Sequence, residues 1–166
     1  MITNRESLKE KIHEIHNYMR NNGIGYGMNA LKVFNFLYGL MKIEDYNQDL
    51  FEEKYRFSYL LELAKEDSKK TNKVINNILV FIFENEKLKP LLYYDIPDDL
   101  NPSVYNNLIK EIHSIKDAEA TSNELLSGKV YEYFIGRDQS SISELGAYFT
   151  NRRIVDFILN KIEVLK

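Results

Sequence analysis

The chain has 166 residues, a formal net charge of −3, 44% hydrophobic residues, 13% aromatic residues and no cysteine. This size and composition predict a folded unit with a core rather than a disordered tail, and they exclude disulfides, zinc-thiolate sites and cysteine nucleophiles. The negative charge argues against a domain that binds DNA tightly by phosphate neutralisation alone, although it permits a few contacts within a larger complex.

The chain lacks the features of an exported or membrane protein. Its first residues pass directly into a helical pattern without an apolar signal region. Its longest apolar run, Ile78 to Phe83, is far too short to span a bilayer. We therefore expect a soluble protein of the cytoplasm with no membrane association.

Apolar residues recur at three- and four-residue steps through most of the first 120 residues. The pattern predicts helices over residues 5–21, from Ala30 to Met41, over 51–66, over 72–86, and from Pro102 through Ile115. The second helix has hardly a charge and should lie at the centre of a bundle. The β-branched middle of 72–86 would also suit a buried strand, but its length and lack of turn residues favour a helix.

The connections carry turn-forming residues. Gly23, Gly25 and Gly27 predict a flexible interhelical turn, because they follow a helix and lack the Lys of a phosphate-binding P-loop. We expect a polar loop at 45–49 and a charged connection at 65–72. Residues 88–99 are predicted to be mostly loop with one short turn, and Pro102 takes the favoured first position of the next helix.

Two more helices are predicted in the last 46 residues. Thr121 and Glu124 are spaced as a capping box for a helix that runs to about Ile135. A polar loop follows, and a last helix begins near Asn151. Because no segment alternates like a sheet strand, the sequence predicts an all-α protein. Residues 1–120 would form an N-terminal helical bundle, and residues 121–166 a linking helix, a motif loop and a further helix.

Residues 146–158 read Gly-Ala-Tyr-Phe-Thr-Asn-Arg-Arg-Ile-Val-Asp-Phe-Ile, a glycine-opened loop that leads into a basic amphipathic helix. This stretch resembles the opening motif of the gamma-type DNA adenine-N6 methyltransferases, above all the modification subunits of type I restriction systems. Those proteins carry a Gly-x-Phe-Tyr-Thr-Pro-like loop and a helix with a Val-Val-Asp-like start. Residues 126–137 look like the helix that precedes the motif in that family. Asn151 departs from the family's usual Pro but can still cap a helix.

The resemblance implies a cofactor pocket at this loop. Tyr148, Phe149 and Thr150 would help enclose the methionine portion of S-adenosyl-L-methionine. On physical grounds alone, the commoner arrangement is a Thr150 that merely caps the helix and aromatic side chains that belong to a core. The matching order and spacing of the loop and its preceding helix favour the pocket.

The resemblance also implies partners. In the family, a helical N-terminal domain helps to hold double-stranded DNA and contacts a specificity subunit, and a second methyltransferase copy is a further expected partner. Arg137, Arg152 and Arg153 flank the motif, and they either touch DNA phosphates or are ordinary surface residues. The residues leave both alternatives open.

Two decisive motifs of the family are absent. The chain has no acidic-Pro-x-x-Gly-x-Gly-like turn for the cofactor and no Asn-Pro-Pro-Tyr-like tetrapeptide to hold a flipped adenine. The sequence Asn101-Pro102-Ser103-Val104 shares only two residues with that tetrapeptide and is interpreted as a helix start. We expect the chain to be non-catalytic alone, with no metal, and to be the front part of an enzyme whose α/β methyltransferase domain follows.

The main alternative is a non-enzymatic helical adaptor that binds another protein through exposed aromatic residues. The candidates are Tyr18, Tyr26, Tyr93, Tyr94 and Tyr105. A complete small DNA-binding protein is disfavoured by the acidic charge balance.

Other polar groups suggest weaker sites. His13 and His16 lie one helical turn apart near Glu10 and Glu14, but no third or fourth ligand is identifiable, so we predict surface histidines rather than a metal site. The acidic residues near Pro97 lack the spacing of a Ca²⁺-binding EF-hand loop. The lysines between 65 and 73 are interpreted as a solvated connection.

Overall fold

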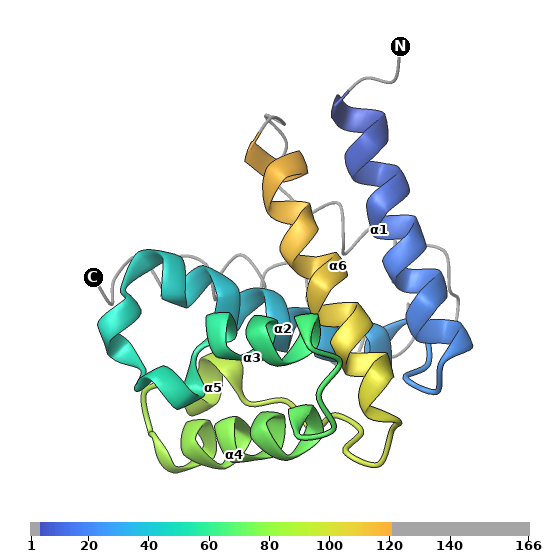
Figure 1. Cartoon of the computed structure of the whole chain (residues 1–166). Coiled ribbons are helices and arrows are strands. Elements are labelled where there is room, and N and C mark those ends of the chain that lie inside the picture. The colour runs from blue at the N-terminus through green and yellow to red at the C-terminus, as the bar shows by residue number, and fades with distance from the viewer. Residues whose placement is uncertain (1–3, 121–166) are drawn as a thin grey trace.

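The computed structural model describes residues 4–120, and within this range every regular element is helical (Figure 1). The elements are α1 (Asn4–Asn21), α2 (Met28–Tyr46), the short 3₁₀ helices η1 (Gln48–Leu50) and η2 (Glu53–Tyr55), α3 (Phe57–Lys65), α4 (Thr71–Glu84), α5 (Lys89–Leu92) and α6 (Pro102–Ala120). The prediction of an all-α bundle is confirmed for this part of the chain. The helix favoured over a strand at residues 72–86 is confirmed as α4.

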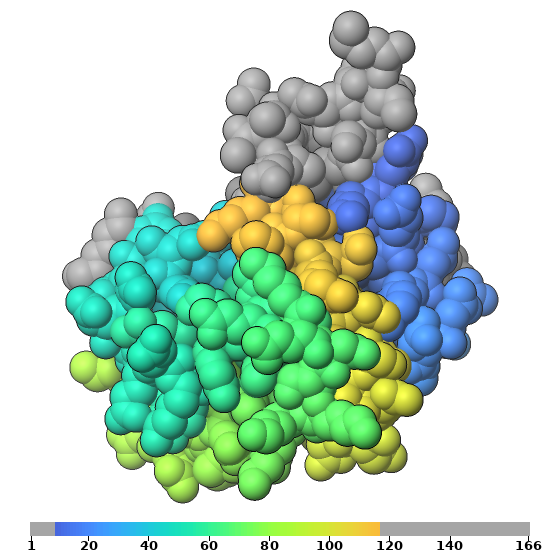
Figure 2. Space-filling view, viewed as in Figure 1, coloured from blue at the N-terminus to red at the C-terminus, as the bar shows by residue number. Residues whose placement is uncertain are grey.

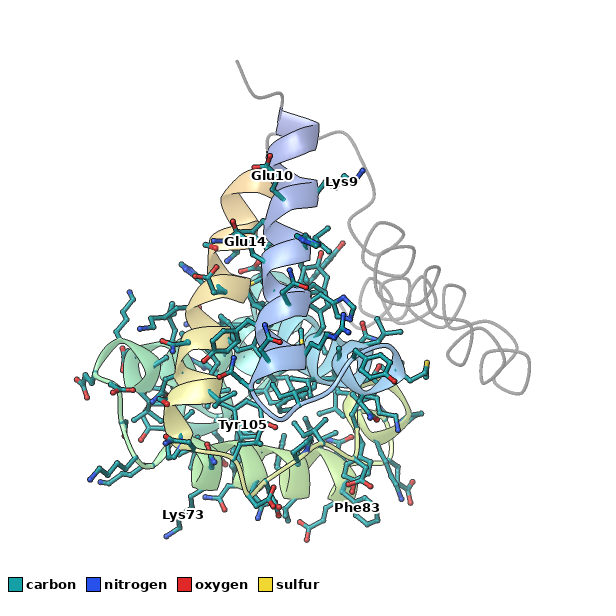
Figure 3. The ribbon with its side chains drawn as sticks, turned by 90° about the vertical axis from the view of Figure 1, so that its right-hand side faces the viewer. Lys9, Glu10, Glu14, Lys73, Phe83 and Tyr105 are labelled. Carbon is teal, nitrogen blue, oxygen red and sulfur yellow. The ribbon has the colours of Figure 1, made fainter. Side chains whose placement is uncertain are left out.

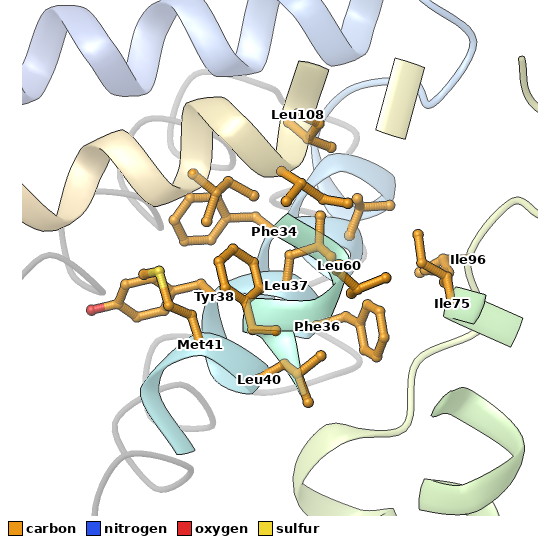
Figure 4. Close-up of a cluster of buried hydrophobic side chains, with 14 of the residues drawn as sticks. Phe34, Phe36, Leu37, Tyr38, Leu40, Met41, Leu60, Ile75, Ile96 and Leu108 are labelled. Carbon is orange, nitrogen blue, oxygen red and sulfur yellow. The ribbon is translucent and has the colours of Figure 1, made fainter. Parts of the chain in front are cut away.

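Helix α2 lies at the centre of the core, as its composition predicts. Every residue from Phe36 to Met41 is buried, so side chains on all sides of the helix are covered by neighbours. Figure 4 shows this cluster, in which Leu60 of α3 and Leu108 of α6 lie near Phe34 and Leu37 of α2. Each such side chain contributes about 1.5–3 kcal/mol when it leaves water.

Helices α1 and α6 form an antiparallel pair. The ammonium of Lys11 lies 2.6 Å from the carboxylate of Glu111, and Asn107 Nδ2 donates to the hydroxyl of Tyr18 over 3.1 Å. Position 11 therefore faces 111 and position 18 faces 107, which fixes the opposite directions of the two helices. Figure 2 shows their atoms meeting along the visible face. Helix α6 also packs on α3, where the Phe57 and His113 rings are stacked 6.4 Å apart.

The glycine segment between α1 and α2 is an interhelical turn, as predicted. Gly23, Gly25 and Gly27 have φ angles of 89°, 103° and 61°, in the left-handed region that favours glycine. The amides of Ile24 and Gly25 both donate to Met19 O at 3.2 Å, which closes the end of α1. The Gly27 amide donates to His16 Nε2 over 3.4 Å. These amides are used inside the protein and do not form a phosphate cradle.

The third predicted helix is wrong at its start. The sequence predicts a helix from Phe51, but α3 begins at Phe57 and is preceded by the separate turn η2. The carboxylate of Glu44, at the end of α2, accepts hydrogen bonds from the Ser58 amide (2.9 Å) and the Ser58 hydroxyl. Arg56 Nε donates to Phe51 O over 3.0 Å and holds the bend. A carboxylate from another helix therefore caps α3 and sets where it begins.

Other boundaries differ by a few residues. Helix α2 continues to Tyr46, so only the second half of the predicted loop at 45–49 lies outside it. Helix α5 is the short turn predicted within 88–99. Helix α6 begins at Pro102 with Asn101 as its cap, since Asn101 Oδ1 accepts from the Ser103 amide over 3.0 Å. It runs on to Ala120, beyond the predicted Ile115.

A buried polar cluster ties α6 to the connection before α4. Among the described side chains, Thr71 and Asn106 are the buried polar residues, and both are fully covered. Asn106 Nδ2 donates to Asp67 Oδ1 (3.0 Å) and Ser68 O (2.9 Å), and its Oδ1 accepts from the Thr71 hydroxyl. Both the side-chain oxygen and the side-chain nitrogen of Asn106 have hydrogen-bond partners. The cluster therefore holds α6 to the connection before α4 without leaving a polar atom of Asn106 unsatisfied.

Candidate binding groove

The predicted cofactor and DNA residues lie outside the described part of the chain. These are Tyr148, Phe149 and Thr150 of the motif loop and the flanking arginines Arg137, Arg152 and Arg153. The site described below is a different one, formed by α4 and the segment that follows α5.

The five tyrosines proposed for an adaptor surface differ in their exposure and fall into three groups. Tyr26 and Tyr93 are exposed, at 53% and 38% of their surface. Tyr18 and Tyr94 are half-buried against the core. Tyr105 is fully buried, so its assignment as an exposed candidate is wrong. Its position explains this burial, because Tyr105, Leu108 and Ile112 share the core-facing side of α6.

Two apolar side chains of α4 are exposed, although the sequence pattern does not predict it. Val80 is 50% exposed and Phe83 is 48% exposed. Phe83 projects from α4 in Figure 3, at the opposite end of the helix from Lys73. Its ring makes an edge contact with Tyr93 at a centroid distance of 5.0 Å. The signal that could have identified them is the run of Ile78 to Phe83, since a helix with one buried face must turn part of such a run outward.

The segment Tyr93–Leu100 runs antiparallel to α4. Phe83, near the end of the helix, touches Tyr93, whereas Asn72, near its start, donates to Leu100 O over 2.6 Å. A groove of about 380 Å³ lies between the helix and this segment. Ile75, Leu79 and Ile96 are buried residues of its lining.

All charged residues that line the groove are acidic: Glu84, Asp95 and Asp98. Lys89 is not a lining residue, and its ammonium lies 3.7 Å from the centroid of the Phe83 ring. The groove therefore presents negative charge beside exposed aromatic surface, which favours a cationic ligand.

One buried polar atom in the groove wall has no partner. Asn72 Oδ1 is covered and accepts no hydrogen bond, although Nδ2 of the same amide donates to Leu100 O. A buried acceptor without a donor costs about 1–3 kcal/mol of stability.

Burial raises the pKa of two tyrosines beside the groove. The pKa of Tyr105 lies well above its ordinary value, first because the ring is buried and then because Asp98 and Asp99 oppose a phenolate. The Tyr105 hydroxyl donates to Pro97 O. Burial likewise raises the pKa of Tyr94, and a hydrogen bond with Asn35 acts in the opposite direction.

These raised pKa values predict that the fold weakens in alkali. An unfolded tyrosine loses its proton near pH 10, whereas Tyr94 and Tyr105 keep theirs in the folded state. Their contribution to the free energy of unfolding is present in full below about pH 10. It is lost as the pH rises above that value, because the unfolded chain then binds fewer protons than the folded chain. Urea unfolding from about pH 8 to about pH 11 should show this fall. The double variant Tyr94→Phe/Tyr105→Phe should flatten it, and an unchanged slope would contradict the assignment.

A second hollow lies on the other side of α4. It has a volume of about 370 Å³ and is lined by Lys54, Tyr55, Tyr59, Val74, Asn77, Val80, Phe81 and Glu84. Tyr55 and Phe81 are stacked there at a centroid distance of 4.5 Å. Val80 and Glu84 line both hollows, so they form a ridge between the two.

The two histidines of α1 make contacts within the protein. His13 Nε2 lies 3.0 Å from Asn17 Nδ2, and His16 accepts from the Gly27 amide. Over the described residues, no group of three or more His, Cys, Asp or Glu side chains is arranged to hold a metal ion. Lys65, Lys69, Lys70 and Lys73 are exposed around the α3–α4 connection, in agreement with a solvated segment.

None of the described helices is both long enough and apolar enough to cross a lipid bilayer. In comparisons with known proteins, no family model, no curated protein and no solved structure matches the chain. The helical bundle and its acidic groove are therefore interpreted from their own residues.

Proposed function

We propose that this chain is the N-terminal helical domain and opening motif of an S-adenosylmethionine-dependent DNA adenine-N6 methyltransferase, similar to type I modification subunits. One observation carries the proposal: the sequence 146–158 resembles the family's opening motif, with Asn151 in place of the usual Pro, and follows a segment, 126–137, that looks like the family's preceding helix. The helical bundle over residues 4–120 is in keeping with the helical domain that precedes the motif in the family. The domain is non-catalytic alone.

The motif residues suit the proposed pocket chemically. The first turn of a helix presents unpaired amides and a partial positive charge, which bind a carboxylate such as that of a methionine group. Thr150 caps this turn or gives its hydroxyl to the ligand, and Tyr148 and Phe149 supply flat apolar surfaces beside it. When bound, S-adenosylmethionine supplies the methyl group that passes to the amino nitrogen of adenine. The residues that hold the flipped adenine belong to a downstream region.

The bundle would assist in clamping double-stranded DNA, and the arginines beside the motif would supply the phosphate contacts. Three contacts, from Arg137, Arg152 and Arg153, predict weak binding with a logarithmic salt slope of about −2.7. The affinity for a duplex should then fall about 40-fold between about 50 mM and about 200 mM salt. Fluorescence anisotropy with a labelled duplex measures this dependence.

Charge-matched variants separate specific contacts from general attraction. Replacing the three arginines by alanine should abolish most of the salt dependence. Replacing Lys9, Lys87 and Lys110, which are exposed lysines of the bundle, removes the same charge and should leave the slope nearly unchanged. Equal effects of the two triple variants, or no salt-dependent binding by the unmodified chain, would reject these DNA contacts.

A helical adaptor is the second candidate function, and one observation favours it. The exposed Val80 and Phe83 of α4, together with Tyr93, form apolar surface beside two hollows. Exposed apolar surface rimmed by polar groups is typical of protein-binding sites. This surface does not involve the motif loop, so the adaptor function can be tested independently of methyl transfer.

A further inference from the structure

We propose that the groove between α4 and Tyr93–Asp98 binds a segment of a protein partner that carries an arginine and, about five residues away, an apolar side chain. The inference rests on the geometry of the groove and not on the methyltransferase motif. It therefore extends the adaptor candidate by naming the chemistry of the partner.

The negative charge of the groove lining favours a cationic ligand. Glu84, Asp95 and Asp98 line it, and no Lys or Arg in the described chain does so. The ammonium of Lys89 lies against the Phe83 ring and is not part of the lining. A positively charged side chain in the groove would therefore meet three carboxylates without a competing cation in the lining.

The carboxylates distinguish arginine from lysine. Asp98 lies at the end of the groove near Asn72, because Asn72 Nδ2 donates to Leu100 O two residues further on. A guanidinium has five N–H donors in one plane, so it can donate two parallel hydrogen bonds to the Asp98 carboxylate. A lysine ammonium is a compact charge without this planar fork and cannot make such a pair.

Exposed apolar side chains at the other end of the groove indicate that the ligand is a peptide rather than a small cation. Asn72 and Phe83 are separated by 11 positions of a helix, which corresponds to about 16 Å. An extended peptide covers this distance in about five residues. Its arginine would occupy the Asn72–Asp98 end, and its apolar side chain would cover Val80, Phe83 and Tyr93, which are otherwise exposed.

A titration with matched peptides tests the proposal. The probe is the acetylated amide Arg-Gly-Ser-Gly-Ser-Leu, added to the ¹⁵N-labelled 166-residue chain. The expected result is a saturable shift of the side-chain amide resonances of Asn72 and Asn76. The same peptide with citrulline, which keeps the shape of arginine and lacks its charge, should bind about tenfold more weakly. A peptide with glycine in place of leucine should no longer shift the Phe83 resonances.

Neighbouring carboxylates supply the matched protein variants. Both carboxylates are exposed, but Asp98 lines the groove and Asp99 does not. We expect Asp98→Asn to weaken binding of the arginine peptide about tenfold and to remove most of its advantage over the citrulline peptide. The affinity of Asp99→Asn should stay within about twofold of that of the unmodified chain, because an exposed charge outside the groove contributes little. Thermal unfolding of both variants checks that the fold is retained.

Four results would overturn the proposal. The first is equal affinity of the arginine and citrulline peptides, and the second is equal binding by the two aspartate variants. The groove resonances could respond to duplex DNA and not to peptide, which would assign the surface to nucleic acid. They could also shift with protein concentration alone, which would make a second copy of this chain the occupant.

Discussion

Replacing Asn106 by leucine is expected to lower the free energy of unfolding by about 3 kcal/mol. The side chain is fully buried, and all of its amide hydrogen bonds are internal to the protein. Leucine has a similar size but neither donates nor accepts, so Asp67 Oδ1 and Ser68 O lose the Nδ2 donor, and the buried Thr71 hydroxyl keeps only Ser68 O as an acceptor. Urea unfolding followed by circular dichroism measures the loss.

The next residue of the same helix provides the control. Asn107 is exposed, and its side-chain Nδ2 donates to the Tyr18 hydroxyl over 3.1 Å. Asn107→Leu makes the same chemical change in solvent and should cost less than about 1 kcal/mol. Similar losses for the two variants would show that the buried cluster does not hold α6 to the α3–α4 connection.

In the whole polypeptide encoded by the gene, Tyr148→Ala and Phe149→Ala are each expected to lower kcat/KM for S-adenosylmethionine roughly 100-fold. The reason is positional, because a displacement of about 1 Å of the methyl donor relative to adenine has an effect of that size. The measurement is transfer of a radiolabelled methyl group to duplex DNA at several cofactor concentrations.

Thr150 provides a conservative pair for the same assay. Thr150→Ser keeps a hydroxyl that can cap the helix or bind the ligand, and it should retain most activity. Thr150→Val removes the hydroxyl at nearly the same size and should follow the aromatic variants. If both substitutions leave kcat/KM unchanged, Thr150 contributes to neither the cap nor the pocket in a way that matters for the reaction.

The helices were predictable where local pattern decides the outcome. Helix α2 has so few charges that its sequence predicts a position at the centre of the bundle, and the structure places it there. Gly23, Gly25 and Pro102 mark their turn and helix start because the backbone geometry of these residue types is restrictive. These features depend on a few adjacent residues, so the sequence alone contains them.

The features that escaped prediction depend on distant residues. The start of α3 is set by Glu44, 14 positions before Ser58 in the chain. The groove depends on the antiparallel course of Tyr93–Leu100 along α4, which no local pattern encodes. Val80 stands in an apolar run that looks like core, and only the packing of α4 on its neighbours decides which side faces water. Tyr105 could have been placed correctly from its spacing to Leu108 and Ile112.

We propose that these residues form the front part of a DNA adenine methyltransferase. The most direct test of this claim is methyl transfer from radiolabelled S-adenosylmethionine to duplex DNA by the unmodified polypeptide, read from the gene to its stop codon. The 166-residue chain alone serves as the reference and should be inactive. The claim predicts label recovered as N6-methyladenine with the whole polypeptide. Absence of labelled adenine at saturating cofactor and DNA, with the polypeptide folded, would contradict it.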